Sequence, residues 1–345
     1  METTDRAQPI FFRPVLMEKV WGGNRIAALN KDKRAEPGKV IGESWELVDR
    51  PEAQSIAVGG AWNGLTLRQI MEQDPVSILG ADLAAAKPAR FPLLAKYVDA
   101  GSALSVQVHP DDIGAKPFND RGKSECWIVI HAEPNSIMVR GLRPYTRREI
   151  YEKVVAAGEA VDMVLHQFRP KAGDVIAMPP GMVHAIGAGI LVAEIQQNSD
   201  LTLRIYDYGR KGLDGKPRPL HVKEATEAIR FDHPGDEFTG DLRQDTVSPL
   251  MKSKARGVTT EVMFKGRYFD LQRFTVEPGR AMNMLALPSA PRVVMVVAGT
   301  GTIGARAFPN GQTMLIPASA TNFEVNAAEG RDLVLLVSAP TKPAC

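Results

Sequence analysis

The sequence is poor in cysteine and carries almost no net charge. Its 345 residues include 2 cysteines, Cys126 and Cys345. Two cysteines provide no disulfide framework, which agrees with a reducing compartment. The 42 basic and 40 acidic residues leave a net charge of +2. This balance gives no electrostatic reason to expect a nucleic acid or membrane-surface partner.

Long apolar segments are also missing. No stretch approaches the roughly 18 apolar residues of a membrane-spanning helix. Residues 1–8 are polar and partly acidic, where a signal peptide needs a basic segment followed by an apolar one. We therefore expect a cytoplasmic protein with no membrane partner. At about 150 residues per domain, the length suits one large domain or two modest ones.

A polar stripe lies along one predicted strand, residues 104–109. Ser105, Gln107 and His109 alternate with apolar residues, so their side chains project from one face of an extended strand. An ordinary barrel strand would bury its apolar face and leave these polar groups in water. The stripe alone therefore does not establish a site.

A second histidine motif favours a metal site over an ordinary barrel strand. Residues 173–184 predict a short strand, a tight turn through Pro179 and Gly181, and a second strand that begins near His184. Two strands that each bring a histidine suggest one shared metal ion.

The rest of the chain is predicted to be rich in strands. Thr146 and Glu149 fit a capping box, with a helix continuing to residue 157. Glu43 and Glu46, on a short strand, are expected to face solvent or to serve the structure. The predicted strands are 41–47, 54–58, 92–98, 124–130, two between 187 and 208, 269–274, 293–297 and 333–337, and the other predicted helices are 65–73 and 222–229.

The two halves of the chain share a short pattern. Gly173 is followed by five residues and Pro179, and Gly311 by five residues and Pro317. The second copy is followed by no histidine through residue 323. This is the pattern of a double barrel with one active and one blank site.

Four motifs in order carry a resemblance to a known family. The spacing of Gly173, Pro179, Gly181 and His184 matches the second sequence motif of cupins, without that motif's final Asn. Segments 107–110, 123–127, 181–185 and 194–204 occur in the same order in type I phosphomannose isomerases. The sequence resembles the short bacterial form of that family from about residue 14 to residue 230.

The resemblance implies a mainly β fold of two cupin-like jelly-roll barrels with a few short helices. Residues 1–235 would form the metal-bearing catalytic domain. Residues 236–345 would form a degenerate cupin-like domain without metal ligands.

The resemblance also implies a metal centre. Gln107, His109, Glu125 and His184 would bind one Zn²⁺ per chain. Two imidazoles and a carboxylate leave room on the ion for water or substrate, as catalytic zinc sites require, and a neutral Gln oxygen is a weaker fourth donor. The same donors would also accept Mn, Fe or Co.

By the same resemblance, the protein would be an isomerase that reversibly converts mannose 6-phosphate to fructose 6-phosphate through an enediol. Ser105, Lys123 and Arg204 would bind the sugar phosphate. The implied catalytic residues are Lys123, Glu194, Asp200 and Arg204. Of the two acids, Glu194 is favoured for proton transfer because it shares a strand face with Gln196, although either acid could instead orient Lys123 or Arg204.

Two alternatives stay open at this point. An isomerase could act on an unphosphorylated aldose, with altered roles for Ser105, Lys123 and Arg204. A non-enzymatic sugar-binding bicupin would keep the metal without turnover. The sequence does not indicate an oligomeric state. The remaining histidines, His131, His166, His221 and His233, have no motif around them and are expected to be structural or exposed.

Overall fold

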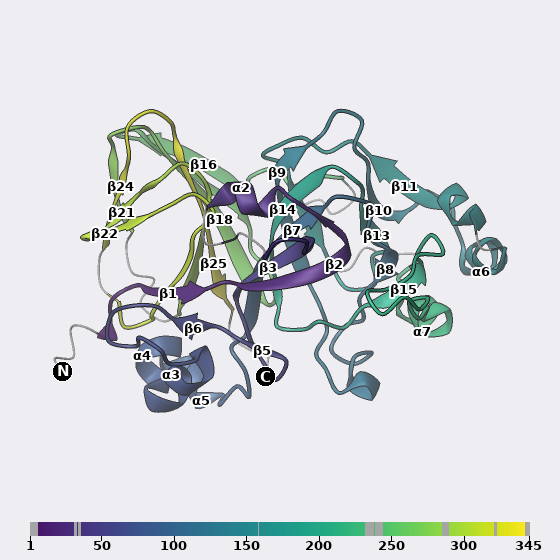
Figure 1. Cartoon of the computed structure of the whole chain (residues 1–345), viewed down its shortest axis with the longest axis horizontal. Coiled ribbons are helices and arrows are strands. Elements are labelled where there is room, and N and C mark those ends of the chain that lie inside the picture. The colour runs from purple at the N-terminus through teal and green to yellow at the C-terminus, as the bar shows by residue number, and fades with distance from the viewer. Residues whose placement is uncertain are drawn as a thin grey trace.

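Strands dominate the computed structural model of the protein, which describes residues 6–30, 33, 36–157, 159–231, 238, 244–284, 290–320 and 323–341. They form four larger sheets and one two-stranded ladder of β4 (Asp49–Arg50) and β5 (Ala53–Gln54). Figure 1 shows two lobes, one teal and one green to yellow, with the N-terminal strands between and beneath them. The predicted mainly β class is confirmed.

The first barrel consists of two facing sheets. The larger has the order β12 (Val175–Met178), β9 (Glu125–Ala132), β14 (Ile190–Gln197), β7 (Leu93–Ala100), β2 (Val15–Gly23) and β3 (Ile41–Leu47). The smaller has the order β11 (Leu165–Phe168), β10 (Met138–Leu142), β13 (His184–Ile186), β8 (Val106–Val108) and β15 (Leu203–Tyr206).

The second barrel also pairs a large sheet with a small one. The large sheet has the order β16 (Met251–Ala255), β17 (Val258–Phe264), β18 (Phe269–Val276), β25 (Leu333–Pro340), β20 (Arg292–Ala298), β23 (Thr313–Ile316), β1 (Ile10–Arg13) and β6 (Ile56–Ala57). The small sheet has the order β19 (Ala281–Met284), β24 (Phe323–Ala327), β21 (Gly301–Ile303) and β22 (Arg306–Phe308).

The two barrels repeat one topology. In the first, the strand order β12–β9–β14–β7 corresponds to β23–β20–β25–β18 in the second. Gly173 and Gly311, which precede β12 and β23, both adopt a positive φ, of 93° and 74°. The short sequence pattern shared by the two halves therefore marks equivalent turns. Within the described residues, the second barrel holds no cluster of His, Cys, Asp and Glu able to bind a metal ion.

Short helices fill in around the sheets: α2 (Ile26–Leu29), α3 (Leu67–Gln73), α4 (Pro75–Leu79), α5 (Ala81–Ala85), α6 (Arg148–Ala156) and α7 (Val222–Ala228), with 3₁₀ turns η2 (Lys116–Phe118) and η3 (Glu159–Met163). The predicted capping box at Thr146 is wrong. Arg147 is the N-cap residue of α6 and makes no side-chain cap, so Glu149 occupies the second helical position instead of the third. A capping box is present instead at α3, between Thr66 and Gln69.

The large sheet of the first barrel is buried on both faces. On β14, Ala193 and Ile195 belong to a core cluster that also contains Val293 and Leu336 of the second barrel. Val192, on the opposite face, belongs to the interior cluster of the first barrel. Because alternate residues of a strand face opposite ways, each strand contributes to both cores.

The N-terminal strand crosses from one half to the other. β1 pairs with β23, placing Phe11 opposite Met314 in the large sheet of the second barrel. Part of the predicted first domain thus completes that sheet. The division at residue 235 stays a prediction, because residues 232–237 lie outside the described part of the chain. Among the described residues, no helix has the length and hydropathy needed to cross a membrane.

We expect Phe11→Ala to destabilise the protein. Phe11 is 4% exposed and packs in the core of the second barrel, so its truncation should lower the free energy of unfolding by about 3–5 kcal/mol. Phe118→Ala, at a phenylalanine that is 40% exposed, is the matched control and should cost less than about 1 kcal/mol. Urea denaturation followed by circular dichroism measures both, and equal losses would contradict the role assigned to β1.

Candidate active site

The four predicted metal ligands come from both sheets of the first barrel. Gln107 lies on β8, directly opposite His184 at the start of β13. Glu125 begins β9, and His109 follows β8 by one residue. The backbone N–H of Gly181 donates to the carbonyl of His109 at 2.8 Å, which ties the turn of the 173–184 motif to the first histidine.

His109, Glu125 and His184 form a compact buried cluster whose ligand atoms all lie within 4.8 Å of one another. The two histidine Nε2 atoms are 3.2 Å apart. Glu125 Oε2 lies 3.6 Å from His109 Nε2, and Glu125 Oε1 lies 3.4 Å from His184 Nε2. The structure therefore brings together three of the four residues that the family resemblance implied as metal ligands.

The hydrogen bonds of the two imidazoles determine their tautomers. His109 Nδ1 lies 2.7 Å from the carbonyl oxygen of Leu201, and His184 Nδ1 lies 2.8 Å from that of Met182. A carbonyl only accepts, so each Nδ1 carries the hydrogen and donates it. Both Nε2 lone pairs then point into the cluster.

Burial keeps these rings neutral. It lowers the pKa of His184 to about 4 and that of His109 well below its usual value, and the positive charge of Lys123 acts in the same direction on both. Two facing lone pairs beside a buried carboxylate are the donor set of a divalent metal ion. The residues present therefore fit a metal ion, held by His109, Glu125 and His184.

Gln107 is the fourth candidate ligand. Its Nε2 lies 3.3 Å from His184 Nε2, while its Oε1 accepts from the Ser105 hydroxyl at 3.2 Å. Rotating the amide by half a turn exchanges the two atoms and places the oxygen on the side of the histidines. Ser105, Gln107 and His109 thus share one face, as the alternation predicted.

A chain of buried charges continues from the cluster. Lys123 Nζ lies 2.7 Å from Glu125 Oε2 and 3.4 Å from Glu194 Oε1. Lys96 Nζ lies 3.4 Å from that Glu194 oxygen and 3.8 Å from Glu43 Oε1. Burial raises the pKa of Glu194 to about 7, against the opposing charges of Lys96 and Lys123. Lysine and glutamate alternate along this row of buried side chains, so each buried charge has an opposite charge beside it.

These groups line one cavity of about 460 Å³. Ser105, Gln107, Lys123, Glu125, Glu194, Asp200 and Arg204 are all part of its wall, so all but the two histidines of the predicted set border it. Asp200 is exposed at its edge. Arg204, on β15, lies opposite Gln107 and therefore one strand away from the candidate metal ligands.

Several cavity residues were missed from the sequence. Glu43 was expected to face solvent or to serve the structure, yet it is 7% exposed and lines the cavity with Lys96. The charges of Lys96 and Lys19 overcome the effect of burial and lower its pKa to about 2. Glu46, also expected to face solvent or to serve the structure, is buried in an ion pair with Lys33. A signal was present: Lys96 is a charged residue within the otherwise apolar segment 92–98.

Three of the four remaining histidines behave as expected. His131 is exposed, His166 pairs with Asp245 at 2.7 Å, and His221 accepts a hydrogen bond at Nδ1 from the backbone N–H of Arg204 at 3.2 Å. His233 lies outside the described residues, as does Cys345. Cys126 is fully buried, in the core cluster between the barrels.

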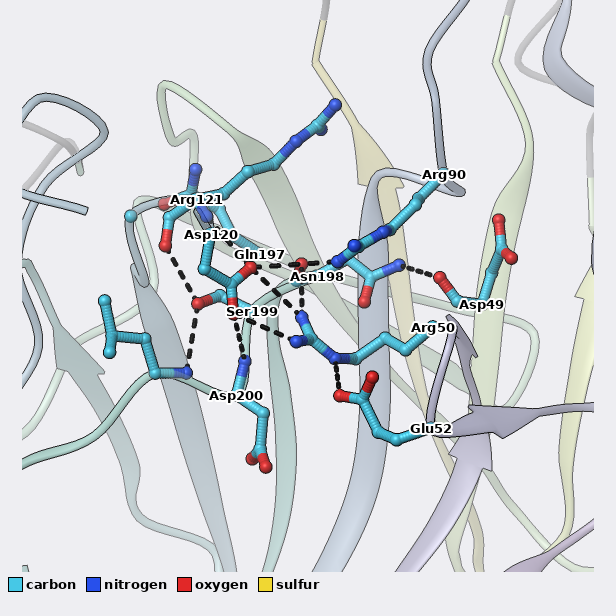
Figure 2. Close-up of polar contacts among 12 residues, drawn as sticks. Asp49, Arg50, Glu52, Arg90, Asp120, Arg121, Gln197, Asn198, Ser199 and Asp200 are labelled. Atoms are coloured by element: carbon cyan, nitrogen blue, oxygen red, sulfur yellow. Dashed lines mark hydrogen bonds and ion pairs between the residues drawn. The ribbon is translucent and has the colours of Figure 1, made fainter. Parts of the chain in front are cut away.

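A polar network holds the turn that follows β14 (Figure 2). Arg50 reaches the carbonyl of Asn198 at 3.2 Å and Asp120 Oδ2 at 2.9 Å, and Asp120 accepts from the backbone N–H of Asp200 at 3.4 Å. The Ser199 hydroxyl accepts from the N–H of Leu201, whose carbonyl holds His109. The network thus positions His109 from outside the cavity.

The fold and the candidate site together define a cupin-fold protein whose first barrel carries a candidate metal centre. Comparison with known proteins identifies the particular family. The family model for the catalytic domain of type I phosphomannose isomerase matches residues 10–123. Mannose-6-phosphate isomerase ManA of Bacillus subtilis (strain 168) is 32% identical, over 92% of this chain and 96% of its own. The chain belongs to the mannose-6-phosphate isomerase family, whose members are isomerase enzymes.

Other relatives and solved structures agree. Mannose-6-phosphate isomerase of Streptococcus mutans serotype c is 30% identical, over 96% of this chain and 98% of its own. The crystal structure of mannose 6-phosphate isomerase from Bacillus subtilis superimposes with a TM-score of 0.83 at 28% identity, covering 96% of this chain and 99% of that one. The apo form from Salmonella typhimurium matches with a TM-score of 0.69 at 14% identity, over 97% of this chain and 100% of its own, which shows the shared fold.

We expect Asp120→Asn to weaken metal binding about tenfold, because the neutral amide loses the ion pair with Arg50, which itself holds the turn that orients His109. Competition with a metal-chelating dye measures the affinity. Asp99→Asn is the control, since Asp99 is also a carboxylate paired with an arginine, Arg25, but does not contact residues 198–201. An affinity for Asp120→Asn equal to that of the unmodified protein would contradict this positioning role.

Proposed function

We propose that this protein is a zinc-dependent isomerase that interconverts mannose 6-phosphate and fructose 6-phosphate. The observation that carries the proposal is one cavity bordered by Glu125, which belongs to the cluster with His109 and His184, and by Lys123, Glu194 and Arg204. The names of the family relatives support the substrate. The substrate is small and phosphorylated, and we propose that the enzyme works in the cytoplasm.

His109, Glu125 and His184 would hold the Zn²⁺, with Gln107 as a weaker fourth donor. When bound, the ion supplies positive charge that polarises the oxygen atoms of the sugar. One anionic ligand leaves the site with a net charge of about +1, which suits a neutral carbonyl or hydroxyl group. The same donor set accepts Mn, Fe or Co, so elemental analysis identifies the metal.

The reaction moves two hydrogens. A proton leaves C2 of the aldose and arrives at C1, while the O2 proton is transferred to O1, so the enediol gives the ketose with all atoms balanced. Glu194 is our candidate for the base that takes the proton from C2 and returns it to C1. Its Oε1 lies 3.4 Å from both Lys96 Nζ and Lys123 Nζ, so the carboxylate is held in place and its charge is balanced. Asp200, at the edge of the cavity, is the second candidate.

Arg204 would stabilise the negative charge that develops on the sugar oxygens. Arginine carries a permanent positive charge in proteins, so it is not a candidate for the base. No carboxylate of the described residues lies within ion-pair distance of it, and its buried Nε has no hydrogen-bond partner among them. A cation left without a partner at the cavity wall is available to a substrate oxygen.

Chelation tests the metal and the reaction on one purified sample. Removal of the metal should abolish conversion of mannose 6-phosphate to fructose 6-phosphate, and added Zn²⁺ should restore it. Elemental analysis of the same sample should give one metal ion per chain. A stoichiometric metal without turnover would contradict the proposal, and a panel of free aldoses would then be the next assay.

Two substitutions should separate metal binding from turnover. His184→Ala should lose both, because it removes a buried donor. Arg204→Ala should keep the metal and lower kcat about 100-fold or more, since it removes only a charge that stabilises the transition state. Metal content and initial rates measure the two effects. An Arg204→Ala enzyme with a near-normal rate would rule out its catalytic role.

A further inference from the structure

Several positively charged side chains line the cavity, and not all of them pair with its glutamates. Five line it: Lys19, Lys96, Lys123, Arg204 and Arg218. The three lysines each lie within ion-pair distance of a buried glutamate of the same cavity, Glu43, Glu125 or Glu194. The two arginines do not.

Arg218 lies on the connection from β15 to α7, residues 207–221 (Figure 1). Backbone hydrogen bonds between Gly212 and Lys216, at 2.7 Å, and between Gly215 and Gly212, at 3.0 Å, close this connection on itself. It returns to the barrel at His221, whose backbone N–H donates to the carbonyl of Arg204 at 2.7 Å. Arg218 is thereby brought to the cavity wall beside Arg204.

Asp207, a buried carboxylate, forms ion pairs with two arginines of this connection. Asp207 is 2.6 Å from Arg210 and 3.3 Å from Arg218, so it balances only one of their charges. Burial lowers the pKa of Arg218, and the neighbouring charge of Arg204 lowers it further. Among the described residues, Asp207 is the one carboxylate within ion-pair distance of Arg218, and it is shared with Arg210, which leaves the Arg218 guanidinium available to an anionic group of the substrate.

The positions of Lys123 and Ser105 indicate that the phosphate binds at the end of the cavity where Arg218 lies. Lys123 Nζ lies 3.2 Å from His109 Nε2, and Ser105 bonds Gln107, so both lie beside the candidate metal ligands. The C1 and C2 atoms of a substrate belong there, whereas a phosphate on C6 is at the opposite end of the molecule. Gly212, Leu213 and Asp214 of the same connection also line the cavity, and Leu213 is exposed, which places Arg218 near the opening.

We propose that Arg218, positioned by Asp207, binds the phosphoryl group of the substrate and makes the enzyme specific for phosphorylated sugars. The inference rests on the proposed function and adds a residue to it. A guanidinium presents two parallel N–H groups that match two phosphate oxygens, an arrangement that lysine cannot reproduce.

Binding of glucitol 6-phosphate, a hexitol phosphate with no carbonyl to isomerise, tests the inference by calorimetry. Arg218→Ala should weaken it about 10- to 100-fold, the range expected for losing hydrogen bonds to a charged group. Binding of unphosphorylated glucitol should not change. Arg218→Lys should fall between the two proteins, because it keeps the charge but loses the paired donors.

Lys216→Ala is the matched control. It removes one positive charge from the same connection, but Lys216 is exposed and is not among the cavity-lining residues. We expect less than a twofold change in glucitol 6-phosphate binding. A loss as large as that of Arg218→Ala would mean that only general electrostatic attraction operates, and would overturn the inference.

Kinetics distinguishes this inference from the proposed function. Arg218→Ala should raise the KM for mannose 6-phosphate by the same factor as the loss in binding, with kcat within about threefold. Unchanged binding in Arg218→Ala, equal losses for glucitol and its phosphate, or no binding of glucitol 6-phosphate by the unmodified protein would each overturn the inference. Arg218-dependent phosphate binding without any isomerisation would instead overturn the proposed function alone.

Discussion

The first barrel depends on a sheet that is buried on both faces. On β14, Ala193 and Ile195 pack toward the second barrel, while Glu194 and Gln196 face the interior. A shift of one residue in register would exchange these faces, placing the carboxylate in the apolar core. Packing against the second barrel therefore fixes the direction of the charged side chains, so that barrel supports the site even though its described residues supply no metal ligand.

The charges inside the first barrel are stable only as a set. Lys96 and Lys123 share Glu194, and their outer partners are Glu43 and Glu125. Removing a charge from water costs several kcal/mol unless an opposite charge and hydrogen bonds replace the solvent. Deleting any one member takes an opposite charge away from each of its buried neighbours. This coupling explains how a cavity this rich in charge exists within an apolar barrel.

The candidate metal centre is held from outside as well as from inside. Carbonyls of Leu201 and Met182 orient the two imidazoles, and the network around Arg50 and Asp120 holds the turn that carries Leu201. These partners come from β4, from the segment before β9, from the turn between β12 and β13 and from the turn after β14. Four distant parts of the chain must be in place before the histidines can face each other.

Strand alternation and motif spacing were enough to predict the polar stripe of Ser105, Gln107 and His109 and the repeat marked by Gly173 and Gly311, because each depends only on local geometry. That His184 joins the stripe was suggested by the two histidine motifs and implied by the family resemblance. Lys96, Glu43 and Arg218 were not predictable in this way. A charged residue in a sequence is expected in water, and only the folded barrel places opposite charges beside it. The sequence alone therefore determined which side chains share a strand face, whereas the tertiary structure decided which faces meet, because burial and charge pairing depend on contacts between residues far apart in the chain.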